Sequence, residues 1–204
     1  FHSRQHKHAD DLSIQLFSKG KGIFTDAGSY TYQYNLPERM YVESTRAHNC
    51  LEIDGLNYSR FNSDAFGNAI DSVEEIGNCI FIDSTINRRR LYPSDIPNNK
   101  LSNNESVPVK IKHNRVVIYH PEEFIVVIDS MESDRQHNYT QWFHLFPDLK
   151  IKSKEENVQI INADDEFVAA VTPINVSSVN IDIVQGQLKP RLEGWISSNG
   201  NSLV

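Results

Sequence analysis

The sequence has few cysteines, no long apolar run and no excess of positive charge. Cys50 and Cys79 are too few for a disulfide framework, and both lie in apolar strand-like runs, so we expect buried free thiols. No stretch approaches the roughly 20 apolar residues of a membrane-spanning helix. The formal net charge is −7, whereas nucleic-acid-binding domains are usually basic. We therefore expect neither a membrane span nor a nucleic-acid partner.

The chain also lacks a visible signal peptide. It opens directly on its richest cluster of polar motifs, which natural domains rarely do. We therefore expect that an upstream region, with any targeting signal, belongs to the same protein. With 204 residues, of which 39% are hydrophobic, the chain is long enough to bury a core, and we treat residues 1–204 as one domain.

Apolar and polar residues alternate along most of the chain, and no window of twelve or more residues carries a helical apolar stripe. This pattern predicts an all-β fold, an antiparallel multi-stranded β-sandwich. The clearest hairpin joins 116–119 to 124–128, and a second joins 72–76 to 79–84 around Gly77-Asn78. Residues 92–108 are rich in proline and asparagine and predict a long loop. Further strands are expected at 12–16, 50–53, 139–146, 158–161, 167–171, 179–184 and 188–196.

Positive charge is concentrated in one run, Arg88-Arg89-Arg90. A run of this kind is usually a solvated loop or strand edge. It can also form a patch that faces an anion, and the sequence leaves both interpretations open.

Histidines and a carboxylate gather in the first fifty residues. In an extended chain, residues two apart point to the same side, so His6 and His8 can serve one site. His8, Asp26 and His48 supply two imidazoles and a carboxylate, which are zinc ligands. A simple hairpin closing at 20–22 would instead place Asp26 opposite Ser13. The spacing therefore leaves open a shared metal or ordinary solvent-facing or hydrogen-bonded histidines.

The remaining histidines carry simpler expectations. His113, His120 and His137 lie at predicted turns or strand ends, where we expect exposed side chains. His144 lies in an aromatic strand and is expected to be hydrogen-bonded in the core or in a cleft wall.

Four motifs occur in order near the start of the chain: His6-Lys7-His8-Ala9-Asp10, Asp26-Ala27-Gly28-Ser29-Tyr30-Thr31-Tyr32, Arg39 with Tyr41, and Ser44-Thr45-Arg46-Ala47-His48-Asn49. Together they resemble the heparinase II/III family of polysaccharide lyases over about 55 residues. The later segment Gln141-Trp142-Phe143-His144-Leu145-Phe146-Pro147 is similar to a strand of that family.

The resemblance implies a two-part enzyme in which an N-terminal α/α toroid, absent from this chain, carries a catalytic tyrosine and a C-terminal β-sandwich closes the cleft. It implies a catalytic role for His6 and zinc ligation by His8, Asp26 and His48, with the zinc in a structural role. The substrate would be an acidic polysaccharide, such as a glycosaminoglycan or alginate, and the protein would be secreted or periplasmic. A homodimer is compatible with it.

The implied reaction is β-elimination from a uronate-containing chain. A base removes the C5 proton, an acid protonates the leaving oxygen at C4, and the developing charge needs neutralisation. Histidine suits these tasks because its pKa lies near neutrality. We expect Tyr30 and Tyr32 to contact substrate or pack. Arg39 either holds a substrate carboxylate or ties down the loop.

Two other functions remain possible. A cupin-type metalloenzyme also carries His-x-His on a β-barrel, but it needs a glutamate a few residues later and a second motif ending in histidine, and neither is found. A non-catalytic module that binds glycan or serves as a scaffold is the other alternative. A preceding helical domain in the full-length gene would favour the lyase.

Overall fold

The computed structural model describes the chain in six segments: 7–61, 69–97, 100–154, 157–174, 179–197 and 202–204. Within these segments nearly all regular structure is β, and every strand pair is antiparallel, as the alternation predicted. His6 lies outside the described residues. No described helix is long and apolar enough to cross a membrane.

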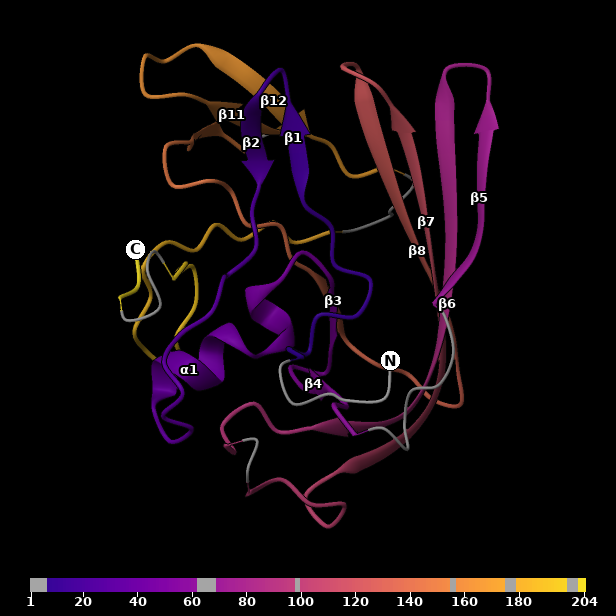
Figure 1. Ribbon diagram of the computed structural model, residues 1–204, viewed down its shortest axis with the longest axis vertical. Coiled ribbons are helices and arrows are strands. Elements are labelled where there is room, and N and C mark those ends of the chain that lie inside the picture. Colours follow the sequence, from indigo (N-terminus) through magenta and orange to yellow (C-terminus); the bar gives the residue numbers. More distant parts are fainter. Residues whose placement is uncertain (1–6, 62–68, 98–99, 155–156, 175–178, 198–201) are drawn as a thin grey trace.

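One large twisted sheet forms the right side of the molecule in Figure 1. Its strands follow the order β4-β6-β7-β8, and β5 pairs with β6. Burial alternates along the middle of β7, where every second side chain is buried. The bounds are β4 Asn57–Tyr58, β5 Ile70–Ile76, β6 Cys79–Tyr92, β7 Val107–His120 and β8 Phe124–Ser133.

Smaller sheets, one short α-helix and a 3-10 turn lie beside this sheet in the part of the chain that the structure describes (Figure 1). The sheets pair β1 with β2, β3 with β9, and β10 with β11 and β12. The helix α1 and the 3-10 turn after it carry the chain toward His48. The bounds are β1 Leu16–Ser18, β2 Lys21–Phe24, α1 Pro37–Val42, the 3-10 turn Thr45–Ala47, β3 Leu51–Ile53, β9 Tyr139–Gln141, β10 Lys150–Ser153, β11 Val158–Ile161 and β12 Phe167–Val171.

Both predicted hairpins are confirmed, and their strands run further than the alternation indicated. The strands predicted at 158–161 and 167–171 have the predicted bounds. Other predictions are wrong. The first strand starts at Leu16 rather than residue 12, and the strand predicted at 139–146 covers only 139–141. The described residues of 179–184 and 188–196 form no strand, and β10 was not predicted. Most of these wrong predictions fall on segments whose backbone is neither helix nor strand.

Three separate buried clusters hold these layers together. One joins Cys50 and Ile53 to Ile111 of β7. A second packs α1 against Ala27 and Ala47, and a third packs β2 against β11. Cys50 is a buried free thiol as predicted, whereas Cys79 is only half-buried. The segments that carry His8, Asp26 and His48 are therefore anchored by three separate parts of the core.

Candidate functional site

Asp26 and His48 form the centre of the candidate site. Asp26 follows β2, and His48 follows the 3-10 turn, 22 positions later. Nδ1 of His48 lies 2.7 Å from Oδ2 of Asp26, while Oδ1 of Asp26 accepts a hydrogen bond from the Gly28 backbone N–H at 2.8 Å. Because a carboxylate accepts hydrogen bonds, Nδ1 of His48 carries the proton. Nε2 of the same ring is buried and has no hydrogen-bond partner among the described residues.

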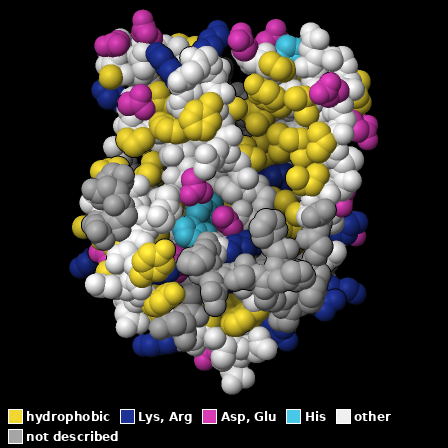
Figure 2. Space-filling view, viewed as in Figure 1, with side chains coloured by type: hydrophobic (Ala, Val, Ile, Leu, Met, Phe, Trp, Pro, Cys, Tyr) yellow, Lys and Arg dark blue, Asp and Glu magenta, His cyan; other side chains and the backbone are white. Residues whose placement is uncertain are grey.

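His8 joins this pair from the start of the chain. The His8 and His48 ring centroids are 5.3 Å apart. The backbone N–H of the next residue, Ala9, donates to the carbonyl oxygen of Glu43 at 3.0 Å, which fixes the segment beside α1. Figure 2 shows histidine side chains grouped near the middle of one face of the molecule, with acidic side chains beside them. The three residues predicted as metal ligands therefore lie together.

The charges at this centre are set by burial and by mutual contact. Burial lowers the pKa of His8 below its usual value, and the adjacent His48 ring lowers it further. Burial alone would raise the pKa of Asp26. The hydrogen bond and the charge of His48, together with the hydrogen bond from Gly28 N–H, outweigh burial, so the pKa of Asp26 is lowered. A neutral imidazole and an ionised carboxylate are the forms that bind metal ions.

His144 forms a further wall of the site. Its backbone carbonyl accepts a hydrogen bond from Thr25 N–H at 2.9 Å, next to Asp26. Burial lowers the pKa of His144 to about 4, and the charge on His48 acts in the same direction. Its Nδ1 is buried without a hydrogen-bond partner among the described residues. His144 is buried, which confirms that it lies in the core or in a cleft wall, but the predicted hydrogen bond is not formed at its Nδ1 with any described residue. Its position beside the Asp26–His48 pair was not predicted.

Asn49 ties the separate segments of the site together. Its Nδ2 donates to the carbonyl oxygens of Ile14 and Thr25 at 2.8 and 2.7 Å, and its Oδ1 accepts from His144 N–H at 2.6 Å. Its own backbone N–H donates to Ser13 Oγ at 3.1 Å. One fully buried side chain thus bonds the chain that follows His8, the chain that precedes Asp26, and His144.

A buried charged network supports the site from the large sheet. Arg115 of β7 bonds both carboxylate oxygens of Asp129, at 2.7 and 2.8 Å. His113 Nε2 lies 2.7 Å from Asp129, and its Nδ1 lies 3.3 Å from the Arg88 guanidinium. Arg115 also donates to the Leu12 carbonyl at 2.7 Å. The prediction that His113 is exposed is wrong, because its strand buries this row of polar side chains against their partners.

The prediction for His137 is also wrong, and that for His120 holds only in part. The His137 ring has no exposed surface, and its Nδ1 lies 2.6 Å from Oδ2 of Asp54 in the Asp-Gly turn. His120 ends β7, as expected for a turn, and its side chain stays one-fifth exposed beside Phe124. Pairing across turns, which the sequence does not display, accounts for both.

Three residues predicted to contact substrate lie around α1. Arg39 is 6% exposed, bonds the Thr31 carbonyl, and lies 2.6 Å from Glu43 Oε1. Its guanidinium lies over the ring of Tyr34, 4.4 Å from the centroid, and 5.4 Å from that of Tyr32. Of the two open interpretations of Arg39, this geometry matches the one in which Arg39 ties down the loop.

The two tyrosines differ in exposure. Tyr32 is 72% exposed, so its ring faces solvent above Arg39. Tyr30 is partly buried and packs against the cluster formed by α1 and Ala27. Glu43 is buried and also bonds Arg60 at 3.0 Å. The charge of Glu43 raises the pKa of His8, and the charge of Arg60 lowers it. Neither residue carried a sequence signal that could have identified it.

The donor set matches zinc in chemistry, with two imidazoles and one carboxylate. His48 Nε2, which is buried without a partner among the described residues, and the nearby His8 ring also fit such an ion. Within the described residues, however, no three His, Cys, Asp or Glu side chains form a ready-made coordination arrangement. Asp26 and His48 instead bond each other directly.

The fold is that of an all-β domain. Its histidine-centred site brings the segment around His8 together with the segments around Asp26 and His48. The chain belongs to the heparinase II/III-like family: the model of its C-terminal domain matches residues 2–190. No curated protein and no solved structure gives a significant match. Family membership implies a polysaccharide substrate and a separate N-terminal domain.

Proposed function

We propose that this chain is the C-terminal part of a lyase that cleaves a uronate-containing acidic polysaccharide by β-elimination. The observation that supports the proposal is the convergence of His8, Asp26 and His48, which come from three segments. His6 precedes His8 by two residues in the same His-x-His motif. We assign His6 as the residue that meets the substrate.

In this proposal His6 acts as a general base or neutralises the substrate carboxylate. Removal of the C5 proton leaves an electron pair that forms the C4–C5 double bond as the C4–oxygen bond breaks. The leaving oxygen takes a proton from an acid in the N-terminal domain. Tyr32, with its exposed ring, is suited to pack against a sugar ring, while Arg39 holds Tyr32 and Tyr34 in place from beneath.

We also propose that His8, Asp26 and His48 hold a zinc ion with a structural role. When bound, the zinc would hold three segments of the site at one point. The protein's own residues already hold these segments, because Asn49 bonds the residue before Asp26 and Arg115 bonds the residue after His48.

The zinc proposal is tested by metal analysis and thermal unfolding of the purified chain. We expect about one zinc per chain, and a loss of thermal stability on chelation, since an ion that binds only the folded state stabilises it. His8→Ala should remove both. His120→Ala, at the tip of the β7–β8 hairpin, is the matched control and should keep both. Absence of zinc, together with unchanged stability of His8→Ala, would contradict the proposal.

The lyase proposal is tested with the full-length protein, which includes the N-terminal domain. Wild-type protein should produce unsaturated uronate from acidic polysaccharide, measured by ultraviolet absorbance, and His6→Ala should reduce kcat by about 10²-fold or more. His120→Ala again serves as control. Normal product formation by His6→Ala would disprove the role of His6, and binding without any cleavage by the wild type would favour a non-catalytic glycan-binding module.

A further inference from the structure

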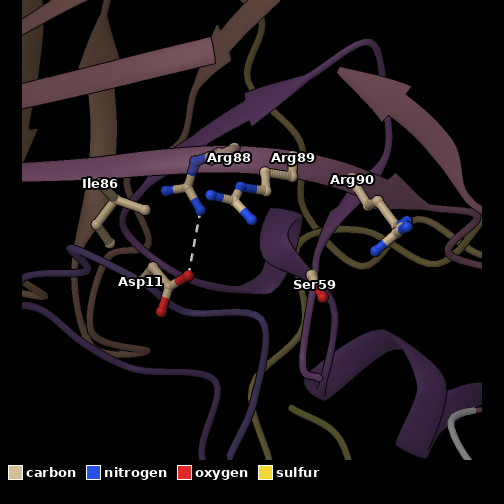
Figure 3. A pocket seen from close by; sticks show the side chains of 6 residues that line it. All are labelled: Asp11, Ser59, Ile86, Arg88, Arg89 and Arg90. Atoms are coloured by element: carbon tan, nitrogen blue, oxygen red, sulfur yellow. Dashed lines mark hydrogen bonds and ion pairs between the residues drawn. The ribbon is translucent and has the colours of Figure 1, made fainter. Parts of the chain in front are cut away.

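The three consecutive arginines of β6 border one small hollow, together with Asp11, Ser59 and Ile86 (Figure 3). In a regular strand, successive side chains point to opposite faces, so Arg89 would point away from Arg88 and Arg90. The pairing of β6 with β7 shifts register between Arg88 and Arg90, as at a β-bulge. Such a bulge interrupts the alternation, and this explains how all three side chains reach the same hollow.

Arg88 forms the buried positive floor of this hollow. It is 5% exposed, lies 3.1 Å from Asp11 and 3.3 Å from His113, and stacks on the Tyr58 ring. Asp11 also pairs with Lys7. Among the described residues that line the hollow, Asp11 is the only carboxylate, and it is shared between Arg88 and Lys7. It forms no ion pair with Arg89.

Arg89 has a different environment. It is exposed, and it makes no hydrogen bond or ion pair with any residue that the structure describes. In Figure 3 its guanidinium extends toward the side where Arg88 meets Asp11, while Arg90 lies on the side of Ser59. The described residues that line the hollow carry three positive charges and one negative charge, a formal +2, in a chain whose net charge is −7. A concave cationic spot of this kind attracts anions selectively.

We infer that this hollow is a binding site for one oxyanion group, a carboxylate or sulfate, with Arg89 as its principal ligand. A guanidinium presents paired N–H donors that match the two oxygens of such a group. Arg88 contributes positive potential from below and stays bound to Asp11. The hollow is small and partly open, so it accepts a charged substituent rather than a sugar ring.

The hollow lies close to the histidine site along the chain. Asp11 follows His8 by three residues, a separation of at most about 11 Å. Ser59 precedes Arg60, which influences the charge on His8. We therefore assign the oxyanion to a neighbouring unit of the same acidic polysaccharide, which rests on the proposed function. The hollow would then anchor the substrate beside the point of cleavage.

The test measures binding to the purified 204-residue chain by calorimetry, with three probes: an unsulfated oligouronate, inorganic sulfate and a neutral oligosaccharide of equal length. Arg89→Gln should weaken oligouronate binding about tenfold or more, and Arg89→Lys should weaken it less. Lys112→Gln, which removes one exposed positive charge on β7, is the matched control and should bind as the wild type does. Thermal unfolding of each variant checks that the fold is retained.

Each outcome decides one point. Equal weakening by Arg89→Gln and Lys112→Gln would show a general charge effect and overturn the site, as would tight binding of the neutral oligosaccharide by all variants. Binding of sulfate but not oligouronate, lost in Arg89→Gln, would support the oxyanion site with sulfate as its group. Normal cleavage by the full-length protein with an unchanged KM in Arg89→Gln would overturn this inference alone. Absence of all cleavage, with Arg89-dependent sulfate binding, would instead reject the proposed function.

Discussion

Arg115 donates a hydrogen bond of 3.0 Å to the backbone carbonyl oxygen of Asn49, at a buried contact between the large sheet and the histidine-bearing segments. The same nitrogen donates to the carbonyl of Leu12, four residues after His8. Arg115 therefore hydrogen-bonds both the segment next to His48 and the segment that follows His8. The sheet positions the site through this side chain.

Arg115→Met should strongly destabilise the chain. The substitution leaves the Asp129 carboxylate buried without its bidentate partner, and breaking a buried pair in this way typically costs about 3–5 kcal/mol. Urea unfolding measures the free energy. Lys112→Met, on the same strand but with an exposed ion pair, should change it by less than about 1 kcal/mol. Similar losses for both variants would contradict a special role for Arg115.

Asn49→Ala should destabilise the fold by about 1–3 kcal/mol, because it leaves buried backbone groups in three segments without their hydrogen-bond partner. Amide hydrogen exchange of His144 N–H should also quicken, since that N–H loses its acceptor. Asn162→Ala, in an exposed turn, is the control and should have a smaller effect on stability. Unchanged exchange at His144 in Asn49→Ala would refute the linking role.

Gly28 and Gly20 provide a matched pair of glycines with a backbone φ of +75°. Alanine is strained at both positions, at a cost of about 1 kcal/mol. At Gly28 the added Cβ would also lie 3.1 Å from the Ser197 carbonyl oxygen, while at Gly20 it meets nothing within 4 Å. Gly28→Ala should therefore have the lower Tm of the two, measured by circular dichroism. The reverse order would contradict the packing described here.

Asp129 should make stability depend on pH in the acid range. Hydrogen bonds from His113 and Arg115 overcome the effect of burial and lower the pKa of Asp129 from 3.8 to about 2. The unfolded state thus binds this proton more readily. The contribution, about 2 kcal/mol, is complete above about pH 5 and is lost as the pH falls from 4 to 2. Carbon NMR of the Asp129 carboxyl measures the pKa directly, and a value near 4 would contradict this prediction.

Local patterns predicted much of the sheet architecture. The β5–β6 and β7–β8 hairpins close through tight turns, so alternation and turn residues in one short stretch define them. The family motifs in the sequence identify His8, Asp26 and His48 as one group. The spacing of these residues alone does not identify the group, because a simple hairpin would place Asp26 opposite Ser13.

The sequence by itself determined the strand periodicity, the two main hairpins and the choice of chemically active side chains, because each depends on neighbours within a few residues. The tertiary structure decided which of these side chains are buried together. His113 and Arg115 alternate in β7 as core positions, yet their burial depends on partners from other strands, Asp129 for both and Arg88 for His113. Burying a charge requires a partner, and the partner's position is a property of the folded chain.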